Sequence, residues 1–313
     1  MKTKLKKYSL ENGRTIFKET EDGRKIRTAF WKAKKVKAYG TVFFLNGHRE
    51  FIEKYSKTFE FFINRGFNVI TLDWRGWGLS DRPFPSRPKV QHISSAAEYQ
   101  LDLNVVIGLA EEKNLARPWH LMAHSLGCLL GLRRLLSEPH RFNSYIFLSP
   151  LWGNVRSLPK FVQKLLLSYE KILKFFWLTK ITNQNPNRYK PYSLTVNFKG
   201  NTLTSDKKQF KRLQAILREN IELHSGTPTL GYLIAILKEI NELSFVDLPN
   251  SKILVLLASH ERITDNDAVL RFIKRHDFIE IQEIKKSQHE ILIEKEEIRG
   301  AALSLIHTFL KSQ

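Results

Sequence analysis

The sequence predicts an α/β protein with a mostly parallel central sheet, helices on both faces and a helical cap insertion late in the chain. Six short apolar runs have the length and composition of strands buried on both faces, at 41–45, 68–72, 119–122, 145–148, 253–257 and 278–284. Helical patterns separate these runs, at 51–65, 96–113 and 125–137. Strands that alternate with helices favour parallel pairing, because the helix supplies the crossover between neighbouring strands.

A hairpin is expected ahead of this alternation, because segments 14–20 and 25–33 flank a Glu-Asp-Gly turn sequence. The alternation stops in the region 152–244, where Lys-rich helical sequence takes its place. We therefore expect an N-terminal core part at 1–151 and a C-terminal core part at 245–313. Between them, 152–244 would form the helical cap.

The composition is that of a compact globular protein. Apolar residues make up 42% of the 313 positions, and 21 Phe, 9 Tyr and 6 Trp supply ample area for a core. The one cysteine, Cys128, has no partner for an intramolecular disulfide. No apolar signal segment follows the basic N-terminus, and no uncharged run reaches the roughly 18 residues of a membrane span. The expected location is the cytoplasm.

The net charge of +20 is concentrated in two segments. Residues 1–38 hold thirteen Lys/Arg against four Asp/Glu, and residues 153–235 hold fourteen against four, while the rest of the chain is nearly neutral. Such segments suit an anionic surface of membrane lipid or nucleic acid, and ordinary solubility charge is the alternative. The sequence contains no nucleic-acid motif with interleaved aromatics, so no nucleic-acid partner is expected.

One strand–turn–helix segment carries the strongest chemical signal. The apolar strand at 119–122 runs through His124-Ser125-Leu126-Gly127 directly into an apolar helix. This arrangement is typical of a nucleophile elbow, a sharp turn that presents a serine at a helix N-terminus, and Ala123 stands where the first glycine is usual. It predicts Ser125 as a nucleophile. The alternative is that Ser125 is only a helix N-cap.

An earlier strand–loop junction suits an oxyanion hole. The chain leaves the apolar strand at 41–45 through Asn46-Gly47-His48. The main-chain N–H groups of His48 and of Leu126, the residue after the predicted nucleophile, would donate to the developing oxyanion. We assign His48 this main-chain role and not that of a base.

Several motifs occur in a recognisable order. Residues 46–50 with Lys54-Tyr55 are similar to the pattern H-G-x-x-E…R/K-Y, with Asn46 at its first position, and 66–80 are similar to G-(F/Y)-x-V…D-x-R-G-x-G-x-S. Further matches follow at 123–127, 149–150, 201–204, 228–229, 231–232 and 289–290. Together these motifs resemble those of monoacylglycerol lipases and bacterial lysophospholipases, over about residues 10–310. The resemblance implies an α/β-hydrolase fold and a serine hydrolase with the chain order Ser…Asp/Glu…His.

The candidate acids follow the late strand at 253–257. The acid in this fold follows a late strand, and the histidine comes last. The resemblance places Glu261 at the acid position, with Glu where many relatives carry Asp. Asp265 and Asp267 lie close enough in the sequence to remain alternatives.

The predicted base is His289, one of ten histidines. It alone follows the last predicted strand, in a polar loop before a C-terminal helix, and it matches the His-Glu position of the family. It would take the Ser125 proton while Glu261 holds its other ring nitrogen in the working tautomer.

These residues imply a serine hydrolase that works through an acyl-enzyme. The resemblance, together with the amphipathic insertion, implies a carboxylester hydrolase of single-chain lipids, a lysophospholipid or a monoacylglycerol. No metal or organic cofactor is expected, because the chain has neither Cys/His zinc spacing nor a Gly-rich phosphate loop. A small-ester hydrolase or peptidase of the same fold is the alternative, and a non-enzymatic binding protein is a more distant one. The sequence predicts no oligomeric state.

The cap region contains an amphipathic pattern at 158–178. Its apolar stripe consists of Phe161, Val162, Leu165, Leu166, Tyr169, Ile172, Leu173 and Phe176. Four lysines lie off the stripe, at Lys160, Lys164, Lys171 and Lys174. We expect one helix here, with its apolar face over the acyl chain of the substrate and its lysines toward an anionic membrane. The protein would then make peripheral contact with the inner face of that membrane.

Overall fold

The centre of the molecule is one eight-stranded sheet in the order β1-β2-β4-β3-β5-β6-β7-β8. A computed structural model describes residues 3–153, 158–175, 178–182 and 190–312. The strands are Arg14–Glu19 (β1), Lys25–Trp31 (β2), Gly40–Leu45 (β3), Phe67–Leu72 (β4), Trp119–His124 (β5), Ser144–Leu148 (β6), Ile253–Ala258 (β7) and Ile279–Ile284 (β8). β2 pairs antiparallel with β1 and β4, and the other five pairings are parallel. The predicted mostly parallel sheet is confirmed.

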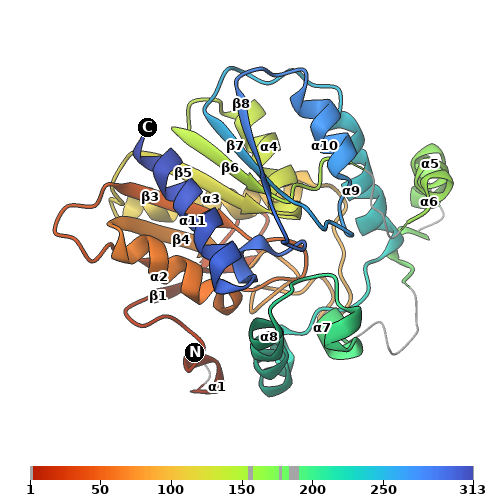
Figure 1. The fold of residues 1–313 in the computed structure, drawn as a ribbon. Helices are drawn as coiled ribbons and strands as arrows, with labels where there is room; N and C mark the ends of the chain where they lie inside the picture. Colours follow the sequence, from red (N-terminus) through yellow and green to blue (C-terminus); the bar gives the residue numbers. More distant parts are fainter. Residues whose placement is uncertain (1–2, 154–157, 176–177, 183–189, 313) are drawn as a thin grey trace.

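Helices cover both faces of this sheet (Figure 1). One face carries Ser56–Asn64 (α2) and Glu296–Lys311 (α11). The other carries Ala97–Glu112 (α3), Leu126–Ser137 (α4), Leu230–Leu243 (α9) and Asn266–Ile273 (α10). Successive side chains of β3 point to opposite faces. Val42 and Phe44 therefore join the core under α2 and α11, whereas Phe43 and Leu45 join the core under α3 and α4.

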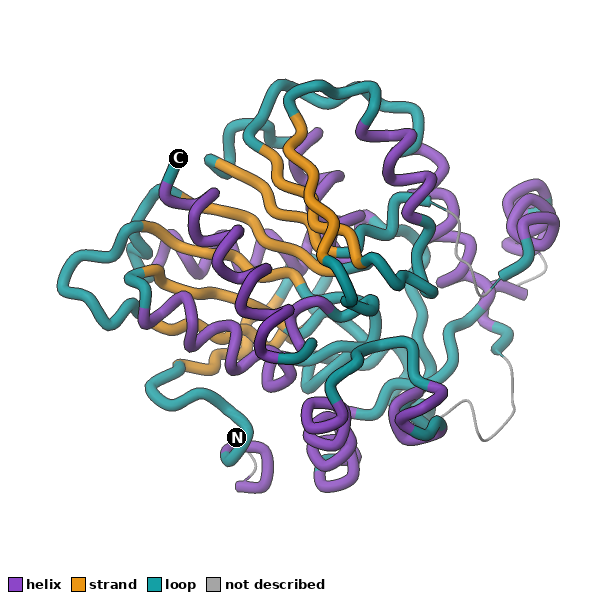
Figure 2. The backbone as a smooth tube through the Cα atoms, in the orientation of Figure 1, coloured by secondary structure: helices purple, strands orange, loops and turns teal. Residues whose placement is uncertain are grey.

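The segment between β6 and β7 adds a series of helices. They are Lys160–Ser168 (α5), Glu170–Phe175 (α6), Leu178–Lys180 (η2), Tyr192–Thr195 (α7), Phe198–Gly200 (η4), Lys207–Glu219 (α8), Ile221–Leu223 (η5) and α9. Figure 2 shows α5, α6, α7 and α8 outside the layered core. By contrast, α9 packs against α4 and belongs to the core on that face of the sheet.

The single helix predicted over 158–178 is wrong. α5 ends at Ser168 and α6 begins at Glu170, with a turn at Tyr169 between them. Ser and Tyr are weak helix formers, and the new helix gains a carboxylate in its first turn.

The predicted inward orientation of the apolar stripe is also wrong. Four of its large side chains are exposed, namely Phe161, Leu165, Tyr169 and Ile172. Three others are half-buried, Val162, Leu166 and Leu173, and Phe176 lies outside the described residues. An amphipathic pattern predicts an apolar face but does not determine what that face contacts.

The two basic segments of the sequence meet in the fold. Leu5 of the N-terminal helix Thr3–Lys6 (α1) packs in one apolar cluster with Leu213, Ile216 and Leu217 of α8. Phe51, just before the short helix Ile52–Tyr55 (η1), completes this contact. The N-terminal segment therefore borders the inserted helices. Among the described residues, no helix combines the length and apolarity needed to cross a membrane.

Candidate active site

The predicted site residues follow the carboxyl ends of four parallel strands. His48 follows β3, Ser125 follows β5, Glu261 follows β7 and His289 follows β8. Carboxyl ends of parallel strands lie at one edge of a sheet, where loops from distant parts of the sequence meet. The fold therefore brings these four residues to one place.

Ser125 occupies a strained turn between β5 and α4. Its backbone has φ 52° and ψ −114°, in a region that residues other than glycine seldom adopt. The turn is held by the Ser125 N–H, which donates to the Leu148 carbonyl of the neighbouring strand at 3.0 Å. Gly127 lets the helix start close to β3, because a Cβ there would lie 2.3 Å from the Leu45 carbonyl oxygen. The sharp turn thus points the serine hydroxyl away from the sheet edge.

Ser125, His289 and Glu261 form one hydrogen-bonded chain. His289 Nε2 lies 3.0 Å from Ser125 Oγ, and His289 Nδ1 lies 2.7 Å from Glu261 Oε2. All three side chains are buried. The carboxylate can accept only, so Nδ1 carries a proton and Nε2 is left to accept from the serine hydroxyl.

Glu261 is held as a carboxylate. Burial would raise its pKa, but His289 and the main-chain N–H groups of Ile263 and Thr264 lower the pKa of this carboxyl to about 2. These two N–H groups donate to Glu261 Oε1 at 2.7 and 3.1 Å, while Oε2 faces the imidazole. The carboxylate is therefore fixed on both sides.

The two sequence alternatives for the acid lie at the start of α10. Asp265 is the N-cap of this helix and accepts from the Ala268 N–H at 3.1 Å, and Asp267 lies in the first turn. The carboxylate that contacts His289 is that of Glu261.

His48 and Leu126 line the same cavity as Ser125. Leu126 is the first residue of α4, so its N–H has no partner within the helix. Among the described residues, neither the Leu126 N–H nor the His48 N–H donates to another protein group. The His48 ring turns to the cavity wall, where its Nε2 lies 2.8 Å from the Gln91 amide. It also contacts the rings of Trp77 and Tyr232.

A cavity of about 1100 Å³ opens above Ser125 and His289. Leucine and isoleucine side chains of the inserted segment form much of its wall, among them Leu158, Leu213, Leu217, Leu230, Leu233 and Ile236. Four cationic side chains also border it, Arg49, Lys54, Lys190 and Arg262. The cavity is therefore largely apolar, with cationic groups at a few places.

Several residues around the site have no signal in the sequence that predicts their contacts. Ser149 Oγ donates to the His289 main-chain carbonyl at 2.8 Å, and Gln91 holds the His48 ring. Their partners are 140 and 43 positions away along the chain. The sequence does show Glu50 two residues after His48 and Glu290 directly after His289. Their proximity to His124 is visible only in the fold.

Comparison with known proteins gives consistent results. Residues 36–296 match the family model described as serine aminopeptidase, S33. The chain is 28% identical over 274 residues to a probable lysophospholipase L2 of Haemophilus influenzae, which covers 86% of this chain and 83% of that protein. It is 25% identical over 281 residues to lysophospholipase L2 of Escherichia coli K12, covering 84% of this chain and 78% of that protein.

Solved structures show the same fold. A soluble variant of monoglyceride lipase from Saccharomyces cerevisiae, solved with a substrate analogue, has a TM-score of 0.74 at 16% identity and covers 96% of this chain and 95% of its own. The monoacylglycerol lipase of Paleococcus ferrophilus has a TM-score of 0.69 at 19% identity and covers 92% and 99%. The resemblance identified from the motifs is confirmed. The chain belongs to the S33 serine aminopeptidase family and has the α/β-hydrolase fold.

Proposed function

We propose that this protein is a serine carboxylester hydrolase of single-chain lipids, with Ser125 as nucleophile, His289 as base and Glu261 as the acid that orients it. The observation that carries the proposal is the hydrogen-bonded chain Ser125–His289–Glu261 at the base of a large apolar cavity. A nucleophile, a base and a group that orients the base, all within hydrogen-bond reach, make up the arrangement that covalent acyl transfer requires.

In the proposed reaction, Ser125 Oγ attacks the ester carbonyl carbon and gives its proton to His289 Nε2. The N–H groups of His48 and Leu126 donate to the oxyanion of the tetrahedral intermediate. The C–O bond to the alcohol breaks, the alcohol takes the proton from His289, and an acyl-serine remains. Water then attacks the acyl carbon and gives a proton to His289. The bond between the acyl carbon and Ser125 Oγ breaks, His289 returns the proton to Oγ, and the carboxylic acid leaves. Only side chains, main-chain N–H groups and water take part.

The apolar wall of the cavity favours a substrate with a single acyl chain. This wall would bury hydrocarbon, each buried CH₂ contributing about 0.8 kcal/mol. The lysophospholipase and monoacylglycerol lipase names of the relatives and of the structural neighbours agree with this choice.

An aminopeptidase function is less well supported. Such an enzyme needs a free carboxylate in its cavity to bind the substrate ammonium group. Among the described residues that line the cavity, the carboxylates are Glu50 and Glu290, and Lys54 forms ion pairs with both. Arg49 and Arg262 on the same wall would repel an ammonium group.

A panel of substrates tests the proposal. Purified protein is incubated with lysophospholipids, monoacylglycerols, diacyl lipids and aminoacyl amides, and the products are identified by mass spectrometry. The proposal expects release of a fatty acid from single-chain lipids and little release from diacyl lipids. Cleavage restricted to aminoacyl amides would contradict it and favour a peptidase.

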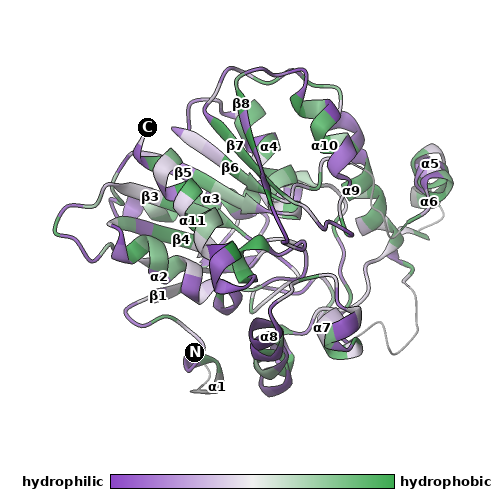
Figure 3. Cartoon of the chain, in the orientation of Figure 1, coloured by the Kyte–Doolittle hydropathy of each residue, from purple (hydrophilic) through white to green (hydrophobic). Residues whose placement is uncertain are grey.

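We further propose that the inserted segment acts as a cap and docks the enzyme peripherally on anionic membrane. The exposed side chains of Phe161 and Leu165 are 72% and 53% accessible, and Lys160, Lys164 and Lys171 are exposed beside them. Figure 3 shows this mixture of hydrophobic and hydrophilic residues on α5 and α6. Contiguous exposed apolar groups flanked by cations are typical of a surface that enters the headgroup region of a bilayer.

Matched charge variants test the docking. Each lysine near an anionic bilayer contributes about 1 kcal/mol, so Lys160, Lys164 and Lys171→Gln should weaken sedimentation with phosphatidylglycerol vesicles by about 100-fold at low salt. The control changes Lys32, Lys34 and Lys37→Gln, which removes the same charge from the loop at the opposite edge of the sheet. Phe161→Ser with Leu165→Ser should weaken the binding that remains at high salt. Docking through α5 would be contradicted if the control lost vesicle binding as much as the variant at Lys160, Lys164 and Lys171. It would also be contradicted if neither that variant nor the Phe161/Leu165 variant lost any binding.

A further inference from the structure

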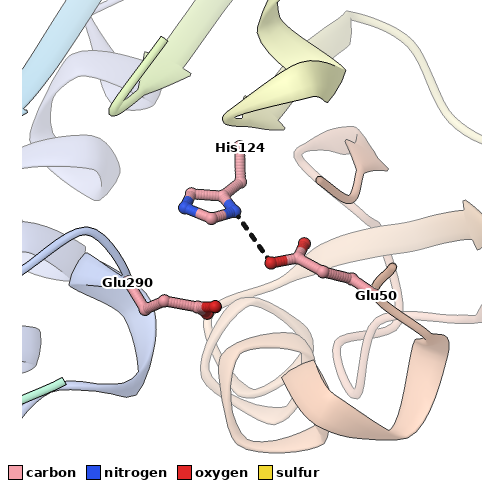
Figure 4. A group of neighbouring side chains, drawn as sticks. All are labelled: Glu50, His124 and Glu290. Atoms are coloured by element: carbon pink, nitrogen blue, oxygen red, sulfur yellow. Dashed lines mark hydrogen bonds and ion pairs between the residues drawn. The ribbon is translucent and has the colours of Figure 1, made fainter. Parts of the chain in front are cut away.

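A buried group of charged side chains adjoins the proposed site, and Figure 4 shows three of its members, Glu50, His124 and Glu290. It consists of Glu50, Lys54, His124 and Glu290, with Tyr55 at its edge, and each is at most 5% exposed. His124 precedes Ser125 in the chain, Glu290 follows His289, and Glu50 is two residues after His48. One member therefore adjoins the nucleophile, one the base and one the oxyanion loop.

The two carboxylates and the imidazole resemble a metal site, because Glu50, His124 and Glu290 offer ligand atoms within 4.8 Å of one another. The position between the carboxylates is taken by a lysine. Lys54 Nζ lies 2.6 Å from Glu50 Oε1 and also forms an ion pair with Glu290. A metal ion would have to displace this ammonium group. The positive charge between the two carboxylates is therefore supplied by the Lys54 side chain and not by a metal.

Both ring nitrogens of His124 face acceptors. Nε2 lies 3.2 Å from the main-chain carbonyl oxygen of His289, and a carbonyl oxygen can only accept. Nδ1 lies 3.1 Å from Glu50 Oε1, an oxygen that also receives the Lys54 ammonium. Nδ1 also lies 3.2 Å from the Tyr55 hydroxyl, but that hydroxyl has one proton and donates it to Glu50 Oε2 at 2.8 Å, so its oxygen too is left to accept. A proton on each nitrogen satisfies both contacts, and this makes the ring an imidazolium.

The charges of the cluster balance in that state. Burial would raise the pKa of Glu50, but Lys54 and His124 hold it well below its ordinary value. Burial would lower the pKa of His124, but the Glu50 carboxylate raises it above the ordinary value. Tyr55, whose pKa is raised by burial, stays a neutral phenol and donates to Glu50 at 2.8 Å. Two carboxylates then face one ammonium and one imidazolium, which is how buried charges are tolerated.

The cluster holds main-chain groups beside those that the proposed reaction uses. Glu50 accepts from the N–H of Gly47, the residue before the proposed oxyanion donor His48. A Cβ on Gly47 would come within 3.0 Å of both Glu50 Oε2 and His124 Nδ1, so the loop lies tightly on the cluster. The His289 carbonyl accepts from His124 on one side and from Ser149 Oγ on the other. The base and the oxyanion loop are thus tied to the residue next to the nucleophile.

We propose that His124 and Lys54 are positioning residues. A permanently protonated His124 fixes the main chain of His289, and Lys54 bridges Glu50 and Glu290, so that base, oxyanion loop and nucleophile keep their relative positions during acyl transfer. This inference rests on the proposed roles of Ser125 and His289.

Nuclear magnetic resonance of histidine labelled with ¹⁵N tests the protonation state directly and needs no activity. We expect one imidazole with two ring N–H protons and both nitrogens at protonated shifts, unchanged between pH 6 and 9. It is assigned to His124 by its loss in His124→Gln, or from its own main-chain correlations if that variant does not fold. A His124 ring with one unprotonated nitrogen in this pH range would overturn the proposal.

Kinetics on a short, soluble ester test the positioning role. Lys54→Met should lower kcat by 10- to 100-fold with little change in KM, because a small displacement of the base slows chemistry without affecting substrate binding. Lys54→Arg keeps the cationic bridge and should recover most of the rate. Arg75→Met is the matched control, since it removes a buried cation that bridges Asp22, Glu98 and Asp102. It should lower thermal stability but leave kcat per folded enzyme unchanged.

The outcomes separate this inference from the proposed function. Equal kcat losses in Lys54→Met and Arg75→Met, or no recovery in Lys54→Arg, would overturn the positioning role. Full activity in a Ser125→Ala enzyme would instead contradict the proposed function, whatever the protonation state of His124.

Discussion

Gly127, near the start of α4, lies against the main-chain carbonyl of Leu45, the last residue of β3. A Cβ added to Gly127 would be 2.3 Å from that oxygen and 2.8 Å from the Asn46 oxygen. The helix after the nucleophile turn and the strand before the oxyanion loop therefore touch through their main chains. This contact sets the distance between Ser125 and the N–H of His48.

Gly127→Ala should be strongly destabilising. The clash is with backbone atoms, which cannot rotate away, so we expect a loss of about 3 kcal/mol in the free energy of unfolding. Gly108→Ala in α3 is the control, because a Cβ there meets nothing within 4 Å. It should gain about 0.5–1 kcal/mol from improved helix propensity. Urea unfolding of both variants measures the difference, and equal stability of the two would contradict the close contact.

Glu261→Gln should lower kcat by roughly 10³–10⁴-fold, because an amide cannot stabilise the imidazolium or enforce the working tautomer of His289. Asp265→Asn should change kcat little, since that side chain caps α10. Steady-state kinetics on a soluble ester distinguish the two. A larger loss in Asp265→Asn than in Glu261→Gln would show that the acid is wrongly assigned.

The carboxylate of Glu261 should also contribute to stability in a defined pH range. Its pKa is about 2 in the folded protein, below the ordinary value of 4.5. The stabilisation is therefore fully present above about pH 4.5 and is lost as the pH falls toward 2. It amounts to about 3 kcal/mol. The difference in unfolding free energy between wild type and Glu261→Gln should shrink over this range, and a difference that is constant from pH 5 to 2 would contradict the low pKa.

His48→Ala should retain much of the activity, whereas His289→Ala should not. The His48 side chain contacts Gln91, Trp77 and Tyr232 rather than Ser125, and the alanine variant keeps the main-chain N–H. Esterase rates of the two variants, corrected for folded fraction, check this. A loss at His48 as deep as that at His289 would reveal a side-chain role.

Much of the fold could be predicted because its signals are local. The six apolar runs correspond to the six strands from β3 to β8, and the hairpin to β1 and β2. Ser125 and His289 could be proposed because a strand–turn–helix pattern and the chain order of this fold identify their positions. Glu261 could be proposed over Asp265 because the resemblance to the family places it at the acid position. These features depend on neighbours in the sequence or on the order of elements.

Features that depend on long-range packing could not be predicted. The amphipathic pattern at 158–178 predicts an apolar face, but the break at Tyr169 and the outward orientation of Phe161 depend on what the segment packs against. The ion pair of Lys54 with Glu290 joins residues more than 230 positions apart, and nothing in either local sequence indicates it.

The most direct test of the account is the site of covalent labelling. An alkyl fluorophosphonate should modify the wild-type protein at Ser125, as located by peptide mass spectrometry. Ser125→Ala should lose both this label and the release of fatty acid from single-chain lipids, while its thermal unfolding midpoint stays near that of the wild type. Labelling of a different serine, or lipid hydrolysis that persists in a folded Ser125→Ala protein, would contradict the central claim.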